Sequence, residues 1–314
     1  MRRRLSTFAR LAFAIGLTWW VVAKAEPARV GAALQGVSWP WVLGAVALVL
    51  VDRTLMAYRW IALLAPLEPG RRPPFRSVLR TFFVSSFIGS FLPSLGGDAV
   101  RTLGLARNGV AVSQSLASVL MDRLLGVLAM VLTAITGVLL APDLLDETIV
   151  RWAIGIAAAG CLVGAAFVFS QRLDEAMTRW LTSWRPGWRR NALQRVLAAI
   201  RAYDRHRRVL LVVLLASVGV QVLRILQAWM LGRGLGIDAP LVVYLAFVPV
   251  ILLVMQLPIT VSGLGTSQWA FQALFTRAGV AAPAAVALSL LFVALGVVGN
   301  LPGLVYYLRG RRAS

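Results

Sequence analysis

The sequence predicts an all-α integral membrane protein, a multi-pass helical bundle with about six full spans and two re-entrant hairpins related as an inverted-topology repeat. Three observations predict this class. The 314 residues are 59% hydrophobic with a mean hydropathy of +0.79, far more apolar than a soluble globular domain. Several apolar runs reach about 20 residues, enough for a helix to cross the hydrocarbon core. Two shorter runs end in a proline followed by glycines, which break a helix. We expect a single membrane domain over residues 1–314.

The composition also excludes several classes of function. The formal net charge is +20, but the basic residues lie between apolar runs. We therefore interpret them as topology signals that face anionic lipid, and not as a nucleic-acid surface. The chain has one histidine, His206, and one cysteine, Cys161. These counts exclude a Cys/His zinc cluster and a bis-histidine haem within the chain. We expect no metal, no other cofactor and no nucleic-acid partner.

The first apolar run, residues 11–23, follows a short basic head. The triplet Ala23-Lys24-Ala25 resembles a signal-peptidase site, but a basic head before an apolar helix is also typical of a retained first span. We expect a retained span with a cytoplasmic N-terminus, followed by a periplasmic loop at residues 24–38.

The second span, Trp39–Leu64, has tryptophans near both ends, which is an interfacial signature, and carries charges in its second half. Asp52 and Arg53 are adjacent and do not share a helical face, whereas Asp52 and Arg59 are seven residues apart and can pair inside the bundle. For Arg59 we favour the alternative, in which its long side chain snorkels to the cytoplasmic surface.

Charge in the loops predicts the topology. Residues 66–76 and the basic loop at residues 171–208 are rich in arginine and are placed in the cytoplasm, whereas residues 142–147 carry three acids and no base and are placed outside. Between residues 66–76 on the cytoplasmic side and residues 142–147 on the outside, the chain must cross the membrane an odd number of times. Residues 116–140 supply one crossing. Residues 79–114 must therefore return to the cytoplasmic side as a re-entrant hairpin.

The second half of the chain follows the same logic. Apolar runs at residues 149–169, 209–231 and 283–308 are full spans, and the arginines after the last one place the C-terminus in the cytoplasm. Residues 241–280 then form a second re-entrant hairpin, which dips in from outside. Two hairpins that enter from opposite sides are the arrangement of an inverted repeat, which many secondary transporters share.

Both hairpins contain helix-breaking proline and glycine residues in the same order. The first breaks at Leu92-Pro93-Ser94-Leu95-Gly96-Gly97-Asp98, and the second breaks at Leu257-Pro258 and Gly263-Leu264-Gly265. An arginine and a Gly-Val pair close each hairpin, at positions 107–110 and 277–280. Broken backbone at membrane depth persists only where protein or a water-filled cavity satisfies its polar groups. The predicted structural residues of the hairpins are Pro93, Gly96, Gly97, Pro258, Gly263 and Gly265.

A known family carries similar motifs. The chain resembles the flippase-like membrane domain of lysylphosphatidylglycerol synthases at residues 92–101, at Val119-Leu120-Met121-Asp122-Arg123 and at residues 257–265. The resemblance covers nearly the whole chain from Trp39 onward. It implies a multi-pass protein of the bacterial inner membrane that moves phospholipids or lipid-linked sugars between leaflets. The soluble aminoacyl-transfer domain of the full synthases would follow the last span, and here the chain ends at Ser314, so a stand-alone membrane domain is expected.

Two positions depart from the pattern of that family. The family usually carries Glu-Arg where this chain has Asp122-Arg123, and this exchange preserves the charges. The family usually carries Arg-Glu where this chain has Ser267-Gln268. The second hairpin therefore lacks an ion pair, which counts against a charge-coupled step at that position.

The predicted substrate site combines the charges of the first hairpin with neutral donors of the second. Arginine binds phosphate through two parallel hydrogen bonds, and the N-terminus of a helix attracts anions. Structural roles remain open: Asp98 can pair with Arg101 only to hold the hairpin, and Arg123 can mark the membrane boundary. Arg224 can serve as a structural partner of Asp122 or Asp98. The candidate substrate-binding residues are Asp98, Arg101, Asp122, Arg123, Arg224, Ser262 and Gln268.

Three functions are weighed. The leading hypothesis is a flippase-like protein, not an enzyme, that moves a phospholipid or lipid-linked sugar headgroup between leaflets. The alternative is a non-catalytic membrane subunit that recruits a separate glycosyl- or aminoacyl-transferase through residues 171–208 in cell-envelope lipid synthesis. The third, a membrane-embedded transferase that uses Asp98 or Asp122, is weakest because the sequence shows no metal-binding acidic cluster or nucleophile–base pair. The expected partners are membrane lipids with an anionic or polyprenyl-linked headgroup, with a soluble transferase on the cytoplasmic side as a further candidate.

Overall fold

The computed structural model describes residues 19–20, 23, 26–67, 74–92, 96–107, 109–141, 148–170, 176, 179, 188–256 and 264–311. Over these residues the chain is helical, without a β-strand. The main α-helices are α2 (Pro27–Gln35), α3 (Trp39–Leu64), α4 (Phe75–Gly89), α5 (Gly96–Ala106), α6 (Val112–Leu140), α7 (Thr148–Phe169), α9 (Trp188–Arg201), α10 (Arg207–Gly234), α11 (Leu241–Gln256), α12 (Thr266–Phe275) and α13 (Ala282–Arg311). The short 3-10 helices η2 (Ala202–His206) and η3 (Thr276–Ala278) precede α10 and α13.

Four helical stretches are long and apolar enough to cross a membrane. They are Trp39–Leu64, Val112–Leu140, Asn191–Gly234 and Ala282–Leu308, and shorter apolar helices cover Val150–Ala166 and Leu241–Gln256. The protein is therefore a helical membrane protein, as its apolar runs predict. The first span expected at residues 11–23 lies outside the described residues, apart from Trp19, Trp20 and Ala23.

Two segments that were predicted as loops contain helices. Within residues 24–38 the structure has α2, whose first residue is Pro27. Proline suits that position because the first N–H groups of a helix have no intrahelical partner. Within residues 171–208 it has α9 and η2, and the Tyr203 hydroxyl donates to the Leu63 carbonyl at 2.6 Å. This contact fixes the segment against the end of α3.

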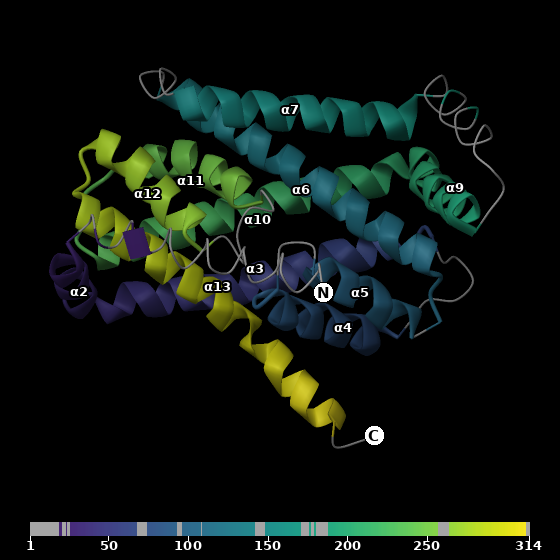
Figure 1. The fold of residues 1–314 in the computed structure, drawn as a ribbon, viewed down its shortest axis with the longest axis horizontal. Helices are drawn as coiled ribbons and strands as arrows, with labels where there is room; N and C mark the ends of the chain where they lie inside the picture. The colour runs from purple at the N-terminus through teal and green to yellow at the C-terminus, as the bar shows by residue number, and fades with distance from the viewer. Residues whose placement is uncertain are drawn as a thin grey trace.

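Two pairs of short helices pack side by side as hairpins, α4 with α5 and α11 with α12. The helices have 15, 11, 16 and 10 residues, so none is longer than about 24 Å, whereas the hydrocarbon core is about 30 Å thick. In the first hairpin the backbones nearly touch, because a side chain at Gly97 would lie 3.1 Å from the Gly89 Cα atom. The hairpins lie toward opposite ends of the long axis of the molecule (Figure 1). Pro93, Pro258 and Gly263 lie outside the described residues.

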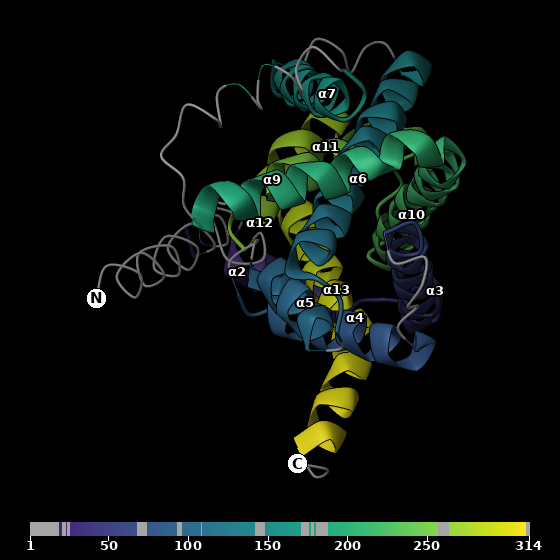
Figure 2. The ribbon, with the colours of Figure 1, turned by 90° about the vertical axis from the view of Figure 1, so that its right-hand side faces the viewer.

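The long helices tie the two hairpins together. α4 lies against α13, α11 lies against α6, and α3 and α10 make the most extensive contact between two helices. Glycine permits two of these contacts: a side chain at Gly303 would collide with the Phe83 carbonyl on α4, and a side chain at Gly137 would collide with the backbone of Ala246 on α11. The last turns of α13 project beyond the rest of the bundle (Figure 2).

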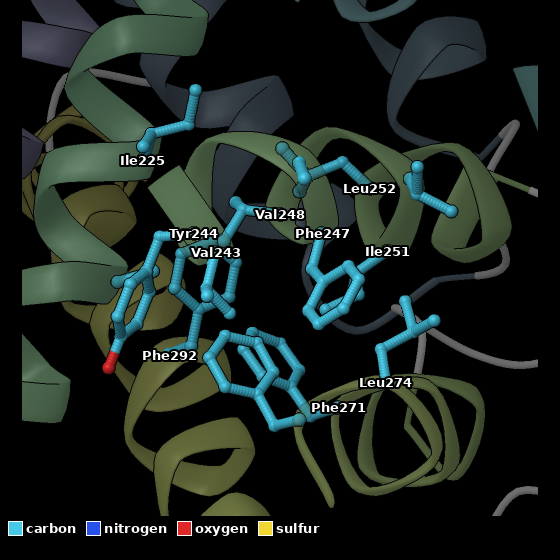
Figure 3. Packing of buried hydrophobic residues seen from close by; sticks show 14 of the residues in the cluster. Ile225, Val243, Tyr244, Phe247, Val248, Ile251, Leu252, Phe271, Leu274 and Phe292 are labelled. Carbon is cyan, nitrogen blue, oxygen red and sulfur yellow. The ribbon is translucent and has the colours of Figure 1, made fainter. Parts of the chain in front are cut away.

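The main apolar core surrounds the second hairpin. Tyr244 and Phe247 of α11 point toward Phe271 of α12 and Phe292 of α13 (Figure 3). The ring of Phe275 completes the group, with its centroid 5.0 Å from that of Tyr244 and 5.5 Å from that of Phe271. Such aromatic contacts add stability beyond the area they bury. The core thus lies on the α11–α12 side of the bundle, and its residues Leu252 and Phe292 also line a cavity that contains buried charges.

Candidate functional site

The site is built around Asp122, which α6 places deep in the bundle. Arg59 of α3 contacts the carboxylate, with Nη2 2.7 Å from Oδ1, and the same nitrogen donates to the Asp122 carbonyl at 3.2 Å. The prediction that Arg59 snorkels to the surface is wrong, because the residue is only 3% exposed. A lone arginine on a lipid-facing helix would seek water, but here a carboxylate on a neighbouring helix neutralises it.

Arg101 of α5 lies on the other side of the same carboxylate. Its Nη1 is 3.7 Å from Asp122 Oδ2, and its Nε lies 3.5 Å from the Ser85 hydroxyl. The guanidinium also stacks over two aromatic rings, 5.0 Å from the centroid of Trp60 and 4.8 Å from that of Phe82. These cation–π contacts hold a buried arginine without using up its hydrogen-bond donors.

Asp98 pairs with Arg123 and not with the Arg101 of its own helix. Arg123 Nη2 and Nε lie 2.8 and 2.9 Å from the same oxygen, Asp98 Oδ2. Asp98 occupies the first turn of α5, where the helix dipole favours a carboxylate. Arg123 Nη1 also donates to Gln256 Oε1 at 3.3 Å. These contacts link the first hairpin, α6 and the end of α11 at a single arginine.

A second charged group surrounds Asp52 of α3, which is 1% exposed. Arg224 Nε is 3.5 Å from one carboxylate oxygen, and Arg53 Nη1 is 3.7 Å from the other. Neither oxygen accepts a hydrogen bond from a described residue. Pairing of Arg224 with Asp122 or Asp98 was left open as an alternative, but the ion pair that Arg224 forms is with Asp52. Nearby, Asn300 Nδ2 donates to the Ser90 hydroxyl at 2.8 Å.

These charges line two cavities that share a wall. The first has a volume of about 280 Å³ and the second about 220 Å³. Arg224, Leu252 and Met255 line both cavities, so the arginine lies where the two meet. The charged residues of the first are Arg59, Asp98, Arg101, Asp122, Arg123 and Arg224. The polar residues of the second are Asp52, Arg53, Ser90, Arg224, Gln227 and Asn300.

The two cavities carry more positive than negative charge. Five arginines and three aspartates line them among the described residues, which leaves a surplus of two positive charges. Arginine cannot lose its proton in a protein, so this surplus is permanent. Buried charge is costly without a counter-charge, and guanidinium groups bind phosphate, like carboxylate, through paired charge-assisted hydrogen bonds. The arrangement is therefore suited to an anionic, phosphate-like group.

Of the two other predicted site residues, the structure describes only Gln268, and it lies apart from the cavities. Gln268 is fully buried, and its Oε1 accepts hydrogen bonds from Gly265 N at 2.6 Å and from the Ser267 hydroxyl at 3.1 Å. Gln268 caps the N-terminus of α12 and lines neither cavity. Ser262 lies outside the described residues. Sequence reasoning missed Gln256, although its place directly before Leu257-Pro258 was a usable signal.

No group of three or more His, Cys, Asp or Glu side chains that could hold a metal ion occurs within the part of the chain that the structure describes. The fold and the site thus define a class: a helical membrane protein with two adjoining, arginine-rich cavities. The family model of the lysylphosphatidylglycerol synthase TM region matches residues 7–303, and the chain belongs to this family. Neither a curated protein nor a solved structure matches the chain.

Proposed function

We propose that this protein moves the headgroup of an anionic phospholipid or of a lipid-linked sugar between the leaflets of the bacterial inner membrane, without covalent catalysis. The observation that carries the proposal is the permanent surplus of two positive charges on the adjoining cavities. A headgroup that crosses the bilayer needs a polar path, while its acyl tails stay in lipid. The arginines supply such a path. In this proposal both termini lie in the cytoplasm, on the same side of the membrane as the basic loops.

An inverted repeat supplies the framework for this movement. One half is α3 to α6 and the other is α10 to α13, and each half contains a short hairpin followed by a long helix. The helix contacts exchange consistently between the halves: α4 lies on α13 as α11 lies on α6, and α3 meets α10. In this proposal both hairpins are re-entrant and enter from opposite leaflets. Arg123 then links the start of α5 to the end of α11 at membrane depth, through its contacts with Asp98 and Gln256.

The headgroup follows the arginines from one cavity into the other. Arg123 is the entrance, because its side chain is 41% exposed, whereas that of Arg101 is 10% exposed. Arg224 receives the phosphate where the two cavities meet. The Arg101–Asp122 and Arg224–Asp52 distances of 3.7 and 3.5 Å exceed the roughly 2.8 Å of a charge-assisted hydrogen bond. The guanidinium groups can therefore bind phosphate oxygens without first breaking a short bond.

Reconstitution tests the proposal. Vesicles that contain the purified protein receive a phosphatidylglycerol with a fluorescent label on its headgroup side, and a membrane-impermeant quencher reports how fast the label changes leaflet. The wild-type protein should accelerate the exchange over empty vesicles. Arg224→Gln should slow it roughly 10- to 100-fold, which corresponds to the loss of one charge-assisted hydrogen bond.

The matched control is Arg233→Gln. Arg233 also lies on α10, but it pairs with the exposed Asp238 and lines neither cavity. The control variant should exchange lipid at the wild-type rate. Exchange no faster than in empty vesicles would remove the transport proposal. Equal rates for the two variants would remove Arg224 from the path.

A further inference from the structure

A third cavity, of about 510 Å³, lies between α4, α5 and the last turns of α13. It shares no lining residue with the two charged cavities. On α4 its lining follows one face at Ser77, Thr81, Val84 and Ile88, which are spaced three or four residues apart. We call this cavity the hairpin groove. It begins polar and becomes apolar along α4.

The opposite wall repeats this gradient, because α5 runs antiparallel to α4. Two close approaches establish the register: Gly97 lies beside Gly89, and a side chain at Gly104 would meet the methyl group of Thr81. The groove therefore has one apolar end, lined by residues such as Val100. At its other end lies Arg107, directly after α5.

The polar end of the groove is basic. Arg80 and Arg107 line it together with Tyr307 of α13, and none of the described residues that line the groove is acidic. Neither arginine forms an ion pair with a described residue. Two like charges that face one cavity repel each other unless an anion lies between them. Guanidinium groups bind phosphate through paired charge-assisted hydrogen bonds, and phosphate is the charged group of every anionic phospholipid.

We propose that the hairpin groove binds one anionic phospholipid, with its phosphate between Arg80 and Arg107 and an acyl chain along Val84, Ile88 and Val100. A free phosphate would use only the basic end and would leave the apolar end empty. Leu103, which also lines the groove, is 59% exposed and gives the chain access from the surrounding lipid. By the positive-inside rule, the basic segment before α4 assigns this lipid to the cytoplasmic leaflet, which is rich in anionic lipids. This site stands whether or not the protein moves lipid.

Photolabelling of the full chain in lipid nanodiscs tests the site. The discs consist of phosphatidylcholine with a small fraction of phosphatidylglycerol that carries a photoreactive group on its acyl chain. A parallel sample carries the same group on phosphatidylcholine. The phosphatidylglycerol probe should label residues 75–107 preferentially. Arg80→Gln and Arg107→Gln should each lower that labelling about 5-fold, and the double variant about 25-fold, because an arginine near an anionic headgroup contributes about a factor of five in binding.

Matched variants keep this test decisive. Arg76→Gln removes a charge from the same helix, at an exposed position outside the groove, and should label like the wild type. Val84→Trp keeps both arginines but fills the apolar end, and should abolish labelling even where the arginine variants fail to insert. Added inorganic phosphate should not compete, because it lacks the acyl chain. Arg224→Gln should leave the labelling unchanged, which separates this site from the transport path.

Three results would overturn the proposal. The first is equal labelling by phosphatidylglycerol and phosphatidylcholine. The second is an Arg76→Gln effect as large as that of Arg80→Gln, which would indicate a diffuse surface attraction. The third is wild-type labelling of Val84→Trp, which would place the chain outside the groove.

Discussion

The two helix hairpins share a layout but differ in content. In the first, α5 carries Asp98 and Arg101 into a charged cavity. In the second, α12 buries Phe271 and Phe275 in an aromatic core. The two hairpins have similar helix lengths, and each packs against the long helix of the other half of the chain. The same arrangement of helices therefore supports a polar site at one position and an apolar anchor at the other.

This difference separates stability from function. Close side-chain packing drives helix association inside a membrane, so the aromatic contacts of the second hairpin stabilise the fold directly. Buried ion pairs contribute little net stability, because desolvation offsets their attraction. The charges of the first hairpin therefore add little to folding, and in the proposed function they bind the headgroup. Substitutions in the two regions should separate these roles.

The largest effect on stability is expected in the second hairpin. Phe275→Ala should lower the free energy of unfolding by about 4 kcal/mol, because the ring is fully buried among Tyr244, Phe247 and Phe271. Thermal or denaturant unfolding in detergent measures this loss. Phe91→Ala is the control, since that ring is 62% exposed and should change stability little. A similar loss in both variants would mean that the aromatic core contributes no more to stability than an exposed ring does.

A smaller loss of stability is expected at the charged cavity. Asp122→Asn should cost about 3 kcal/mol, because it leaves Arg59 buried without its counter-charge. The double variant Arg59→Met/Asp122→Leu should recover part of that loss, since the apolar pair needs no counter-charge, whereas Arg101 still loses its contact with Asp122. The same double variant should fail to move lipid in the vesicle assay. If it unfolds as readily as Asp122→Asn, or if it still moves lipid, the separation of stability from function is wrong at this position.

Local sequence signals predicted much of the fold. The breaks after α4 and α11 follow from proline and glycine, and the long apolar runs match the four long helices. The helix within residues 24–38 was missed, although Pro27 is a good first residue for a helix. Residues 24–38 were interpreted as a loop because they connect two expected spans. Short helices in such connections carry little periodic signal.

Which residues of the site form ion pairs with each other was harder to predict than which residues belong to the site. Five of the predicted residues (Asp98, Arg101, Asp122, Arg123 and Arg224) line one cavity. Their pairing depends on contacts between helices far apart in sequence, such as α3 with α10, which periodicity along one helix does not contain. The assignment of Arg59 failed for this reason, because snorkelling considers a single helix in lipid and ignores a carboxylate on its neighbour.

The smallest effect on stability is expected at Arg123, and it should contrast with a large effect on transport. Arg123→Gln should lower the free energy of unfolding by no more than about 1 kcal/mol, because its half-exposed side chain is screened by solvent. The same change removes the proposed entrance of the path, so lipid exchange should fall at least about 10-fold. Arg233→Gln, which removes an arginine from an exposed ion pair, should change neither property. Unfolding and vesicle exchange measured on the same preparations decide the point. If Arg123→Gln loses stability but keeps wild-type exchange, Arg123 is a structural residue. The first hairpin would then stabilise the fold, as the second hairpin does.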